Sequence, residues 1–350
     1  MRRQFEITKD NLHEFLRSFV QPRINFAIEE ILKRDEVSKY SNNNYLWRVV
    51  VKTPRTRRVL FVKQAREHNK RAWETKGEKH YVDPLRICGE YQIMKLLAKL
   101  WGKEYVPEIY YFDPVHCVLV MSDVGGGGSL LVEEFEQGRV HPELGALFGR
   151  LFGKLHANTY ETKQDCCGSP AWRKKIISFF GGWWLGQGIA KFVPRQKLNA
   201  FYREVNCAPR AWIWGDPVYR NIFIKPHGRA SMVDFDHTVA YDPAFDCGIL
   251  TAHWMWMGLK NAKLKIENEK FQRDFWRVYE KQFPPLRLRG GEEGLRTEVD
   301  GIKRRALRWA GIYLVSRTDG RSGSYFKKWP RWEKKIRALG IILFNENSKI

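Results

Sequence analysis

A run of four glycines, Gly125 to Gly128, followed by Ser129, separates two regions whose apolar residues follow different patterns. Consecutive glycines offer no side chain for packing and leave the backbone free to turn, so they continue neither a helix nor a strand. Before this run lie short β-branched and aromatic segments, and after it apolar residues recur mostly at helical spacing. The sequence therefore predicts one domain over residues 1–124 and a second over residues 125–350.

The first region has the pattern of a small sheet with a helix packed on it. Residues 45–52 and 58–63 are rich in valine and aromatic residues and are separated by a turn-like segment, which predicts an antiparallel hairpin. Residues 84–103 carry an apolar stripe at helical spacing, and two strand-like runs follow at 108–112 and 117–122. Residues 11–32 show helical spacing interrupted at Pro22, which predicts two short helices at the start.

The second region is mainly helical. Residues 143–158 form an amphipathic pattern, and most later segments share it, apart from strand-like runs at 212–224 and 232–235. The whole chain is thus predicted to be an α+β protein, with a small antiparallel sheet followed by a larger helical lobe that carries a short hairpin.

The charge limits the partners without choosing one. The 61 Lys and Arg residues against 39 Asp and Glu residues give a net charge of +22, which attracts polyanions such as nucleotides, nucleic acid or an anionic membrane surface. The basic residues are spread along the chain, which favours a solvated surface over one nucleic-acid groove. The basic aromatic segment 327–332 indicates a weak contact with an anionic membrane surface or, alternatively, an ordinary basic helix. No apolar run approaches the ~20 residues of a membrane span, and no secretory signal is visible, so we expect a cytoplasmic protein.

The most specific segment runs from Trp212 to Ile224 and is followed by Asp234 and Asp236. It presents Asp216 and Asn221 after one apolar strand and the two further acids after another. Phosphoryl transfer requires such a set, because an acid orients or deprotonates the attacking hydroxyl while an amide and an acid hold the metal that bridges the ATP phosphates.

These residues resemble the catalytic G-D-x-x-x-x-N and metal-binding D-x-D motifs of the superfamily of aminoglycoside phosphotransferases, choline kinase and methylthioribose kinase. The resemblance extends over nearly the whole chain and implies a protein-kinase-like, two-lobed fold and an ATP- and Mg²⁺-dependent small-molecule kinase. It makes Asp216 the catalytic base, Asn221 and Asp234 the Mg²⁺ ligands, and Asp236 a further metal candidate.

The resemblance also assigns residues of the first region to the nucleotide. Lys63 contacts the phosphates while paired with Glu90, and the backbone of Ser122, Asp123 and Val124 lies near adenine. Two further acids, Asp242 and Asp246, resemble a segment that caps and braces the catalytic loop, and His156 is expected to make a structural hydrogen bond.

Two departures from the pattern bear on activity. The histidine that usually stands two residues before the catalytic acid is Trp214 here, which is expected to remove a hydrogen bond that braces the loop. The phosphate-covering loop, residues 38–44, contains no glycine, so the sequence leaves open whether it closes over phosphates. These departures motivate an alternative, a catalytically inactive kinase-like scaffold. A second alternative is a basic nucleic-acid-binding protein that stacks some of its 14 tryptophans on bases, although no nucleic-acid-binding motif accompanies them.

The resemblance implies that the acceptor is a small-molecule hydroxyl compound. A protein of charge +22 is a poor host for polycationic aminoglycosides, so a sugar-like, neutral or acidic alcohol is favoured. Within the superfamily the resemblance is nearest to methylthioribose kinase, through residues 61–65 and 106–114 and through Arg304 and Arg305, which match its substrate-binding arginine pair. We therefore expect a methylthioribose-like acceptor to be one possibility among sugar-like alcohols.

Overall fold

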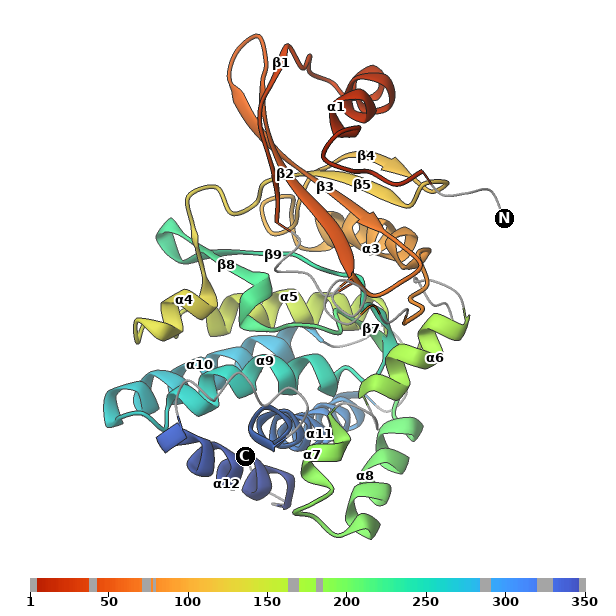
Figure 1. Cartoon of the computed structure of the whole chain (residues 1–350). Coiled ribbons are helices and arrows are strands. Elements are labelled where there is room, and N and C mark those ends of the chain that lie inside the picture. Colours follow the sequence, from red (N-terminus) through yellow and green to blue (C-terminus); the bar gives the residue numbers. More distant parts are fainter. Residues whose placement is uncertain are drawn as a thin grey trace. The chain divides into compact units, whose positions relative to one another are not determined.

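The computed structural model describes residues 5–37, 43–70, 77, 80–162, 170–180, 185–283, 291–319 and 330–345 (Figure 1). The chain divides into two compact units. The N-unit comprises Met1–Gly126 with Cys167–Arg173, and the C-unit comprises Gly127–Cys166 with Lys174–Ile350.

In the described part of the N-unit, a five-stranded antiparallel sheet has the strand order β1-β2-β3-β5-β4. Its strands are β1 (Glu30–Glu36), β2 (Asn44–Lys52), β3 (Arg57–Ala65), β4 (Ile109–Asp113) and β5 (Val118–Ser122). The predicted hairpin is confirmed, because β2 pairs with β3 in the register Val50 to Val59. The predicted strands near 108–112 and 117–122 are confirmed as β4 and β5, and the predicted helix at 84–103 as α3 (Arg86–Leu100).

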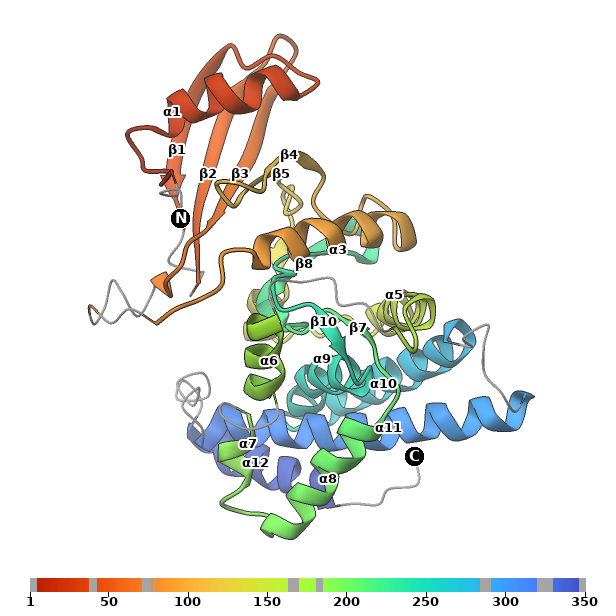
Figure 2. The same cartoon turned by 90° about the vertical axis from the view of Figure 1, so that its right-hand side faces the viewer.

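Helical segments cover the two faces of this sheet. On one face, α1 (Leu12–Phe15) and η1 (Leu16–Val20), followed by the single turn η2 (Gln21–Arg23), pack on alternate residues of the central strands, among them Val49 and Val62 (Figure 2). The intervening residues of β3 point to the other face, where Lys63 meets α3. Successive side chains of a strand point to opposite faces, so alternate residues of β3 pack against the two helical layers.

The prediction of a second helix within residues 26–32 is wrong. The chain is extended there and enters β1 at Glu30, which pairs with Lys52 of β2. The partly buried residues Ile24, Phe26 and Ile28 lie two apart, the spacing of an extended chain. An extended segment here can form backbone hydrogen bonds with the edge of β2, which a helix could not do. This pairing joins residues distant in the chain, so it is not visible in the local sequence pattern.

The C-unit is mainly helical, as predicted. The helices that lie wholly or partly in the C-unit are α4 (Leu131–Glu136), α5 (Leu144–Asn158), α6 (Pro170–Ser178), α7 (Gly186–Ile189), α8 (Arg195–Cys207), α9 (Ala244–Met257), α10 (Ala262–Gln282), α11 (Gly291–Asp319) and α12 (Pro330–Asn345). Helix α9 is buried on nearly all sides and packs on α10 and α11, while α5 packs along α10. The central place of α9 explains its lack of a polar face.

Short strands carry the candidate catalytic residues. Strand β6 (Ser129–Leu130) pairs with β8 (Ile222–Lys225), which pairs with β9 (Arg229–Met232) across the single turn η6 (Pro226–Gly228), while β7 (Ala211–Ile213) pairs with β10 (Val239–Tyr241). The predicted α+β architecture, an antiparallel sheet followed by a mainly helical region with a hairpin, is confirmed.

Two further predictions concern the surface. Among the described helices, none has the length and apolar content needed to cross a membrane. Of the basic segment 327–332, residues 327–329 lie outside the described residues, while Arg331 and Trp332 belong to α12 and contact each other, with the guanidinium carbon 5.1 Å from the ring centre.

Candidate active site

The candidate catalytic loop joins β7 to β8 through a turn that only glycine can make. Gly215 has φ +83°, and a Cβ atom there would lie 2.4 Å from the carbonyl oxygen of His237. Side chains avoid this backbone region, and no side chain fits in that space. The Gly–Asp pair of the motif is thus a steric requirement that delivers Asp216 at the end of a buried strand.

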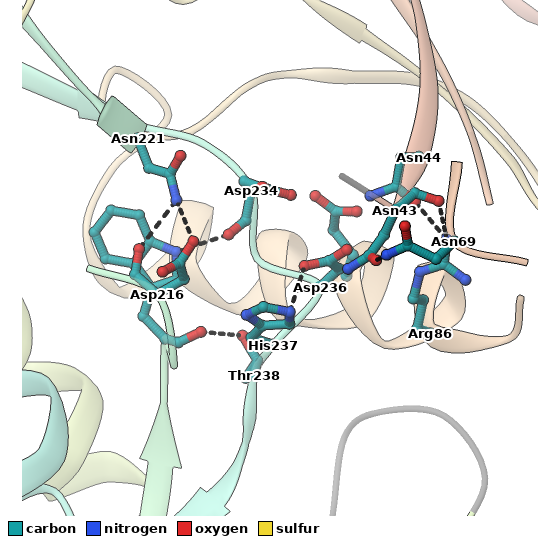
Figure 3. A network of polar contacts seen from close by, with 12 residues as sticks. Asn43, Asn44, Asn69, Arg86, Asp216, Asn221, Asp234, Asp236, His237 and Thr238 are labelled. Carbon is teal, nitrogen blue, oxygen red and sulfur yellow. Dashed lines mark hydrogen bonds and ion pairs between the residues drawn. The ribbon is translucent and has the colours of Figure 1, made fainter. Parts of the chain in front are cut away.

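Asn221 fixes the orientation of Asp216. It ends the single turn η5 (Tyr219–Asn221), and its Nδ2 atom donates to Oδ2 of Asp216 at 2.9 Å and to the Asp216 carbonyl at 3.1 Å. Figure 3 shows the amide oxygen of Asn221 pointing away from Asp216. An amide binds a metal through this oxygen, so the same side chain can hold the acid on one side and a cation on the other.

Asp234 follows β9 and has an unusual backbone. Its φ is +66°, a left-handed conformation that a non-glycine residue adopts at a cost of about 1–3 kcal/mol. The preceding residue, Val233, donates its backbone N–H to the Asn221 carbonyl at 3.0 Å, which joins the two motif segments. Asp234 lies close to Asp216 and Asn221, and backbone contacts join it to their network (Figure 3).

Trp214 corrects a prediction. Its substitution for histidine was expected to remove a loop-bracing hydrogen bond, but the indole Nε1 donates to the Asp234 carbonyl at 2.9 Å. The ring is fully buried and stacks between Phe152 and Phe235. The indole reaches this carbonyl because packing holds the ring, so the catalytic loop is tied directly to the strained Asp234 backbone.

Asp246 of α9 braces the same loop, as predicted. Its two carboxylate oxygens accept the backbone N–H groups of Trp214 at 2.6 Å and Gly215 at 2.9 Å. Asp246 is buried in the first turn of α9, where the helix dipole favours a negative charge. His156 is also buried, with Nε2 3.6 Å from the Asp246 carboxylate and Nδ1 2.9 Å from the hydroxyl of Tyr279, which confirms its structural role.

The donor set fits a magnesium ion. No group of three or more His, Cys, Asp or Glu side chains suited to a metal is found among the described residues, so any ion here depends on few protein ligands. Mg²⁺ prefers oxygen ligands and is often held by one or two carboxylates together with phosphates and water. The amide oxygen of Asn221 and the carboxylate of Asp234 provide such a set. Asp236 is buried two residues further on, with one oxygen 3.8 Å from Nε2 of His237.

In the N-unit, Lys63 and Glu90 form the predicted ion pair. Both carboxylate oxygens of Glu90 lie 2.8 Å from the Lys63 Nζ, and both side chains are nearly inaccessible to water. Ser122, Asp123 and Val124 follow the end of β5, where Asp123 accepts the backbone N–H of Gly125 at 2.8 Å. The pairing is confirmed, and the nucleotide contacts of these residues stay predictions.

Arg86 is a site residue that the sequence analysis missed. Its buried guanidinium donates to the Asn43 carbonyl at 2.9 Å and to Oδ1 of Asn44 at 2.8 Å, and Asn69 donates to the side chain of Asn43 (Figure 3). These contacts fix the end of the glycine-free loop, of which residues 38–42 lie outside the described residues. The signal was present in the sequence, because Arg86 stands one helical turn before Glu90 on α3.

The arginine pair of α11 makes ion pairs within the C-unit. Arg305 is buried and binds Asp242 through Nε at 2.9 Å and a terminal nitrogen at 3.2 Å, and Arg304 binds Glu204 at 2.7 Å. Asp242 also accepts the backbone N–H of Ala244 at 3.0 Å, where α9 begins, which confirms its predicted capping role. These contacts engage both guanidinium groups in supporting the structure.

Several solved structures resemble the chain at low identity. The aminoglycoside phosphotransferase APH(2'')-Ib, in an ADP-bound structure, is 10% identical with a TM-score of 0.47, over 97% of this chain and 99% of that chain. The choline kinase LicA from Streptococcus pneumoniae is 14% identical with a TM-score of 0.46, over 95% and 99%. The macrolide 2'-phosphotransferase MphH from Brachybacterium faecium is 12% identical with a TM-score of 0.45, over 97% and 100%. None of the curated protein sequences matches the chain significantly.

The sequence profile of one family matches a far longer part of the chain than the catalytic and metal-binding motifs alone. The profile described as the phosphotransferase enzyme family covers residues 38–287, from the loop before β2 to the segment after α10. The match includes the Lys63–Glu90 pair and the whole catalytic loop, and it confirms the predicted small-molecule phosphotransferase class. This chain belongs to the phosphotransferase enzyme family.

Proposed function

We propose that this protein is an ATP- and Mg²⁺-dependent kinase that transfers the γ-phosphate to a hydroxyl of a small, sugar-like alcohol. The observation that carries the proposal is the network of Asp216, Asn221 and Asp234, in which one amide orients the acid and the indole of Trp214 holds the Asp234 backbone. A protein that had lost catalysis would have no need of a strained aspartate at this position.

Asp216 acts as the base or aims the attacking hydroxyl. The acceptor oxygen forms a bond to the γ-phosphorus while the bond from that phosphorus to the β–γ bridging oxygen breaks. The hydroxyl proton passes to the Asp216 carboxylate, and ADP leaves with the electron pair of the broken bond. The hydrogen bond from Asn221 leaves one Asp216 oxygen for this proton.

Asn221 and Asp234 would hold Mg²⁺, with Asp236 as a further candidate. When bound, the ion would neutralise charge on the phosphates of ATP. The left-handed backbone of Asp234 and the Trp214 hydrogen bond keep the carboxylate in place before any ligand binds. Preorganisation of this kind reduces the reorganisation needed during the reaction.

Residues 1–124 would form the nucleotide-binding lobe and residues 125–350 the lobe with the catalytic loop and the acceptor site. Lys63, oriented by Glu90, would contact the phosphates, and the backbone of Ser122 to Val124 would contact adenine. If the acceptor is methylthioribose-like, we propose that Arg304 and Arg305 contact it, which would require them to exchange their ion pairs with Glu204 and Asp242 for the acceptor.

The structure weakens the nucleic-acid alternative. That alternative relied on tryptophans that stack on bases, but many of these side chains are buried in the interior. Those buried in the described residues include Trp47, Trp101, Trp172, Trp214, Trp254, Trp256, Trp276 and Trp309.

The test is ADP release from Mg²⁺ and ATP with a panel of sugars and small alcohols. We compare the native protein with Asp216→Asn and with Asp300→Asn, a matched substitution at an exposed carboxylate of α11. Acceptor-dependent turnover should persist in Asp300→Asn and fall at least 100-fold in Asp216→Asn, with ATP binding retained. ATP binding without turnover of any acceptor would favour the inactive scaffold.

A further inference from the structure

A cluster of aromatic and basic side chains lies beside the catalytic loop. We call it the arginine–histidine cluster; it consists of Tyr219 and Arg220 of η5, His253 of α9, and Tyr313 and Arg317 of α11. The ring of His253 contacts Tyr219 edge-on, with centres 4.3 Å apart, and Tyr313 at 5.1 Å. The Arg317 guanidinium lies over the Tyr313 ring, 4.7 Å from its centre.

Arg220 links this cluster to the candidate base. A terminal nitrogen of its guanidinium is 4.0 Å from Oδ2 of Asp216, a distance that allows attraction without a hydrogen bond. Its side chain is 48% exposed, so it can turn toward a ligand. Arg220 also directly precedes Asn221, so any group bound by this arginine lies next to the phosphoryl-transfer residues.

His253 is buried without a hydrogen bond. It is 1% exposed, and neither Nδ1 nor Nε2 has a hydrogen-bond partner among the described residues. Burial, and then the charges of Arg317 and Arg220, lower the pKa of His253 well below its ordinary value. The ring is therefore neutral, with one donor and one acceptor, and buried polar groups of this kind call for a partner such as a ligand or water.

We infer that the arginine–histidine cluster binds the acceptor and that the acceptor is an alcohol carrying an anionic group, a phosphate or a carboxylate. The inference rests on the proposed kinase function. The guanidinium of Arg317 lies over Tyr313, whose ring contacts His253, and Arg220 directly follows Tyr219, whose ring contacts His253 from η5. Guanidinium groups match the oxyanions of phosphate and carboxylate in charge and shape. The hydroxyl of such a molecule would reach Asp216 while its anionic group is held at the arginines.

The chemistry of the cluster also selects against other acceptors. A cationic alcohol would be repelled by the guanidinium of Arg220 beside Asp216 and by that of Arg317 over Tyr313, and such repulsion is an effective means of specificity. The net charge of +22 further favours the approach of anions.

The first test uses matched acceptors that differ in the anionic group. Glycerol, glycerol 3-phosphate, glycerate and choline, together with glucose, glucose 6-phosphate and gluconate, are compared by ADP release with Mg²⁺ and ATP. We expect kcat/KM for the best anionic member to exceed that of its neutral partner at least tenfold. The phosphate and carboxylate members show which oxyanion is preferred. Equal turnover of neutral or cationic members would overturn the inference.

The second test identifies the residues. Arg220→Gln and Arg317→Lys should raise KM for the anionic acceptor about 10- to 100-fold and change KM for ATP less than twofold. Arg277→Gln, an exposed arginine of α10 paired with Asp274, is the matched control. Arg220 is half-exposed, so its variant carries the test if Arg317→Lys fails to fold. Acceptor KM values that rise no more than in the control would refute the assignment.

Binding of inorganic phosphate separates this inference from the proposed function. Calorimetric titration should show phosphate binding that weakens in Arg220→Gln and Arg317→Lys but persists in Lys63→Met, which removes the proposed nucleotide contact. If this pattern holds but no alcohol is phosphorylated, the kinase proposal fails and the anion site stands. If alcohols are phosphorylated without preference for anions, the kinase stands and the anion site fails. Phosphate binding that depends only on Lys63, or is absent, also rejects the anion site.

Discussion

The hydrogen bond from Trp214 to Asp234 allows a quantitative test of how the acid proposed to bind Mg²⁺ is held. Trp214→Phe removes the indole N–H but keeps an aromatic ring between Phe152 and Phe235. The bond is partly shielded from water, so its loss should cost about 1–2 kcal/mol. Because Asp234 has φ +66°, the released backbone can relax toward ordinary angles and carry the carboxylate away from Asn221.

The expected kinetic effect follows from this energy. A loss of 1–2 kcal/mol corresponds to about a 5- to 30-fold change. We expect kcat to fall by that factor and the Mg²⁺ concentration for half-maximal rate to rise, while the acceptor KM stays within twofold. Steady-state rates over a Mg²⁺ titration measure both quantities, and urea unfolding measures the accompanying loss of stability.

Trp309→Phe is the matched control, because Trp309 is equally buried in the C-unit but its Nε1 has no hydrogen-bond partner among the described residues. It reports the cost of the lost ring volume alone. If Trp214→Phe lowers kcat and Mg²⁺ affinity no more than Trp309→Phe does, the reasoning is refuted. Trp214→His restores the usual residue of the superfamily. If its imidazole reaches the Asp234 carbonyl, kcat should be higher than that of Trp214→Phe.

Other contacts give further predictions. Glu90→Gln leaves the buried Lys63 charge unpaired and should lower the free energy of unfolding by about 3 kcal/mol, measured in urea; a loss below 1 kcal/mol would contradict a buried ion pair. Asp246→Asn removes one of the two carboxylate oxygens that accept hydrogen bonds from the catalytic loop. This change should lower kcat about tenfold and leave the KM for ATP unchanged. An unchanged kcat would show that the brace is dispensable. The pKa of Glu134 is lowered from 4.5 to about 2, chiefly by hydrogen bonds from Arg139, so its stabilising effect is complete above about pH 4.5 and is lost as the pH falls toward 2. The melting temperature of the native protein should therefore fall more steeply over this range than that of Glu134→Gln, and parallel curves would speak against the lowered pKa.

Local patterns in the sequence predicted the elements that depend on local rules. Runs rich in valine and aromatic residues identified β2 and β3, because such side chains favour strands, and helical spacing of apolar residues identified α3 and α5. The G-D-x-x-x-x-N motif located Asp216 and Asn221, since a left-handed glycine and a short turn are requirements of the backbone itself. The same reasoning failed at β1, where the pairing partner lies about twenty residues further along the chain.

The sequence by itself predicted the reaction class, because Lys63, Glu90, Asp216, Asn221 and Asp234 stand in the order of a phosphotransferase motif set, and the family match confirms that class. Only the tertiary structure decided how they are held. Trp214 looked like a lost brace in the sequence, yet its buried ring donates a hydrogen bond to Asp234, and Arg86 holds Asn43 and Asn44 at the end of a loop without glycine. The ring contacts of His253 with Tyr219 and Tyr313, and of Arg317 with Tyr313, likewise depend on η5, α9 and α11 meeting in space. Such contacts join residues far apart in the chain, and the packing that aligns them leaves no local pattern to read.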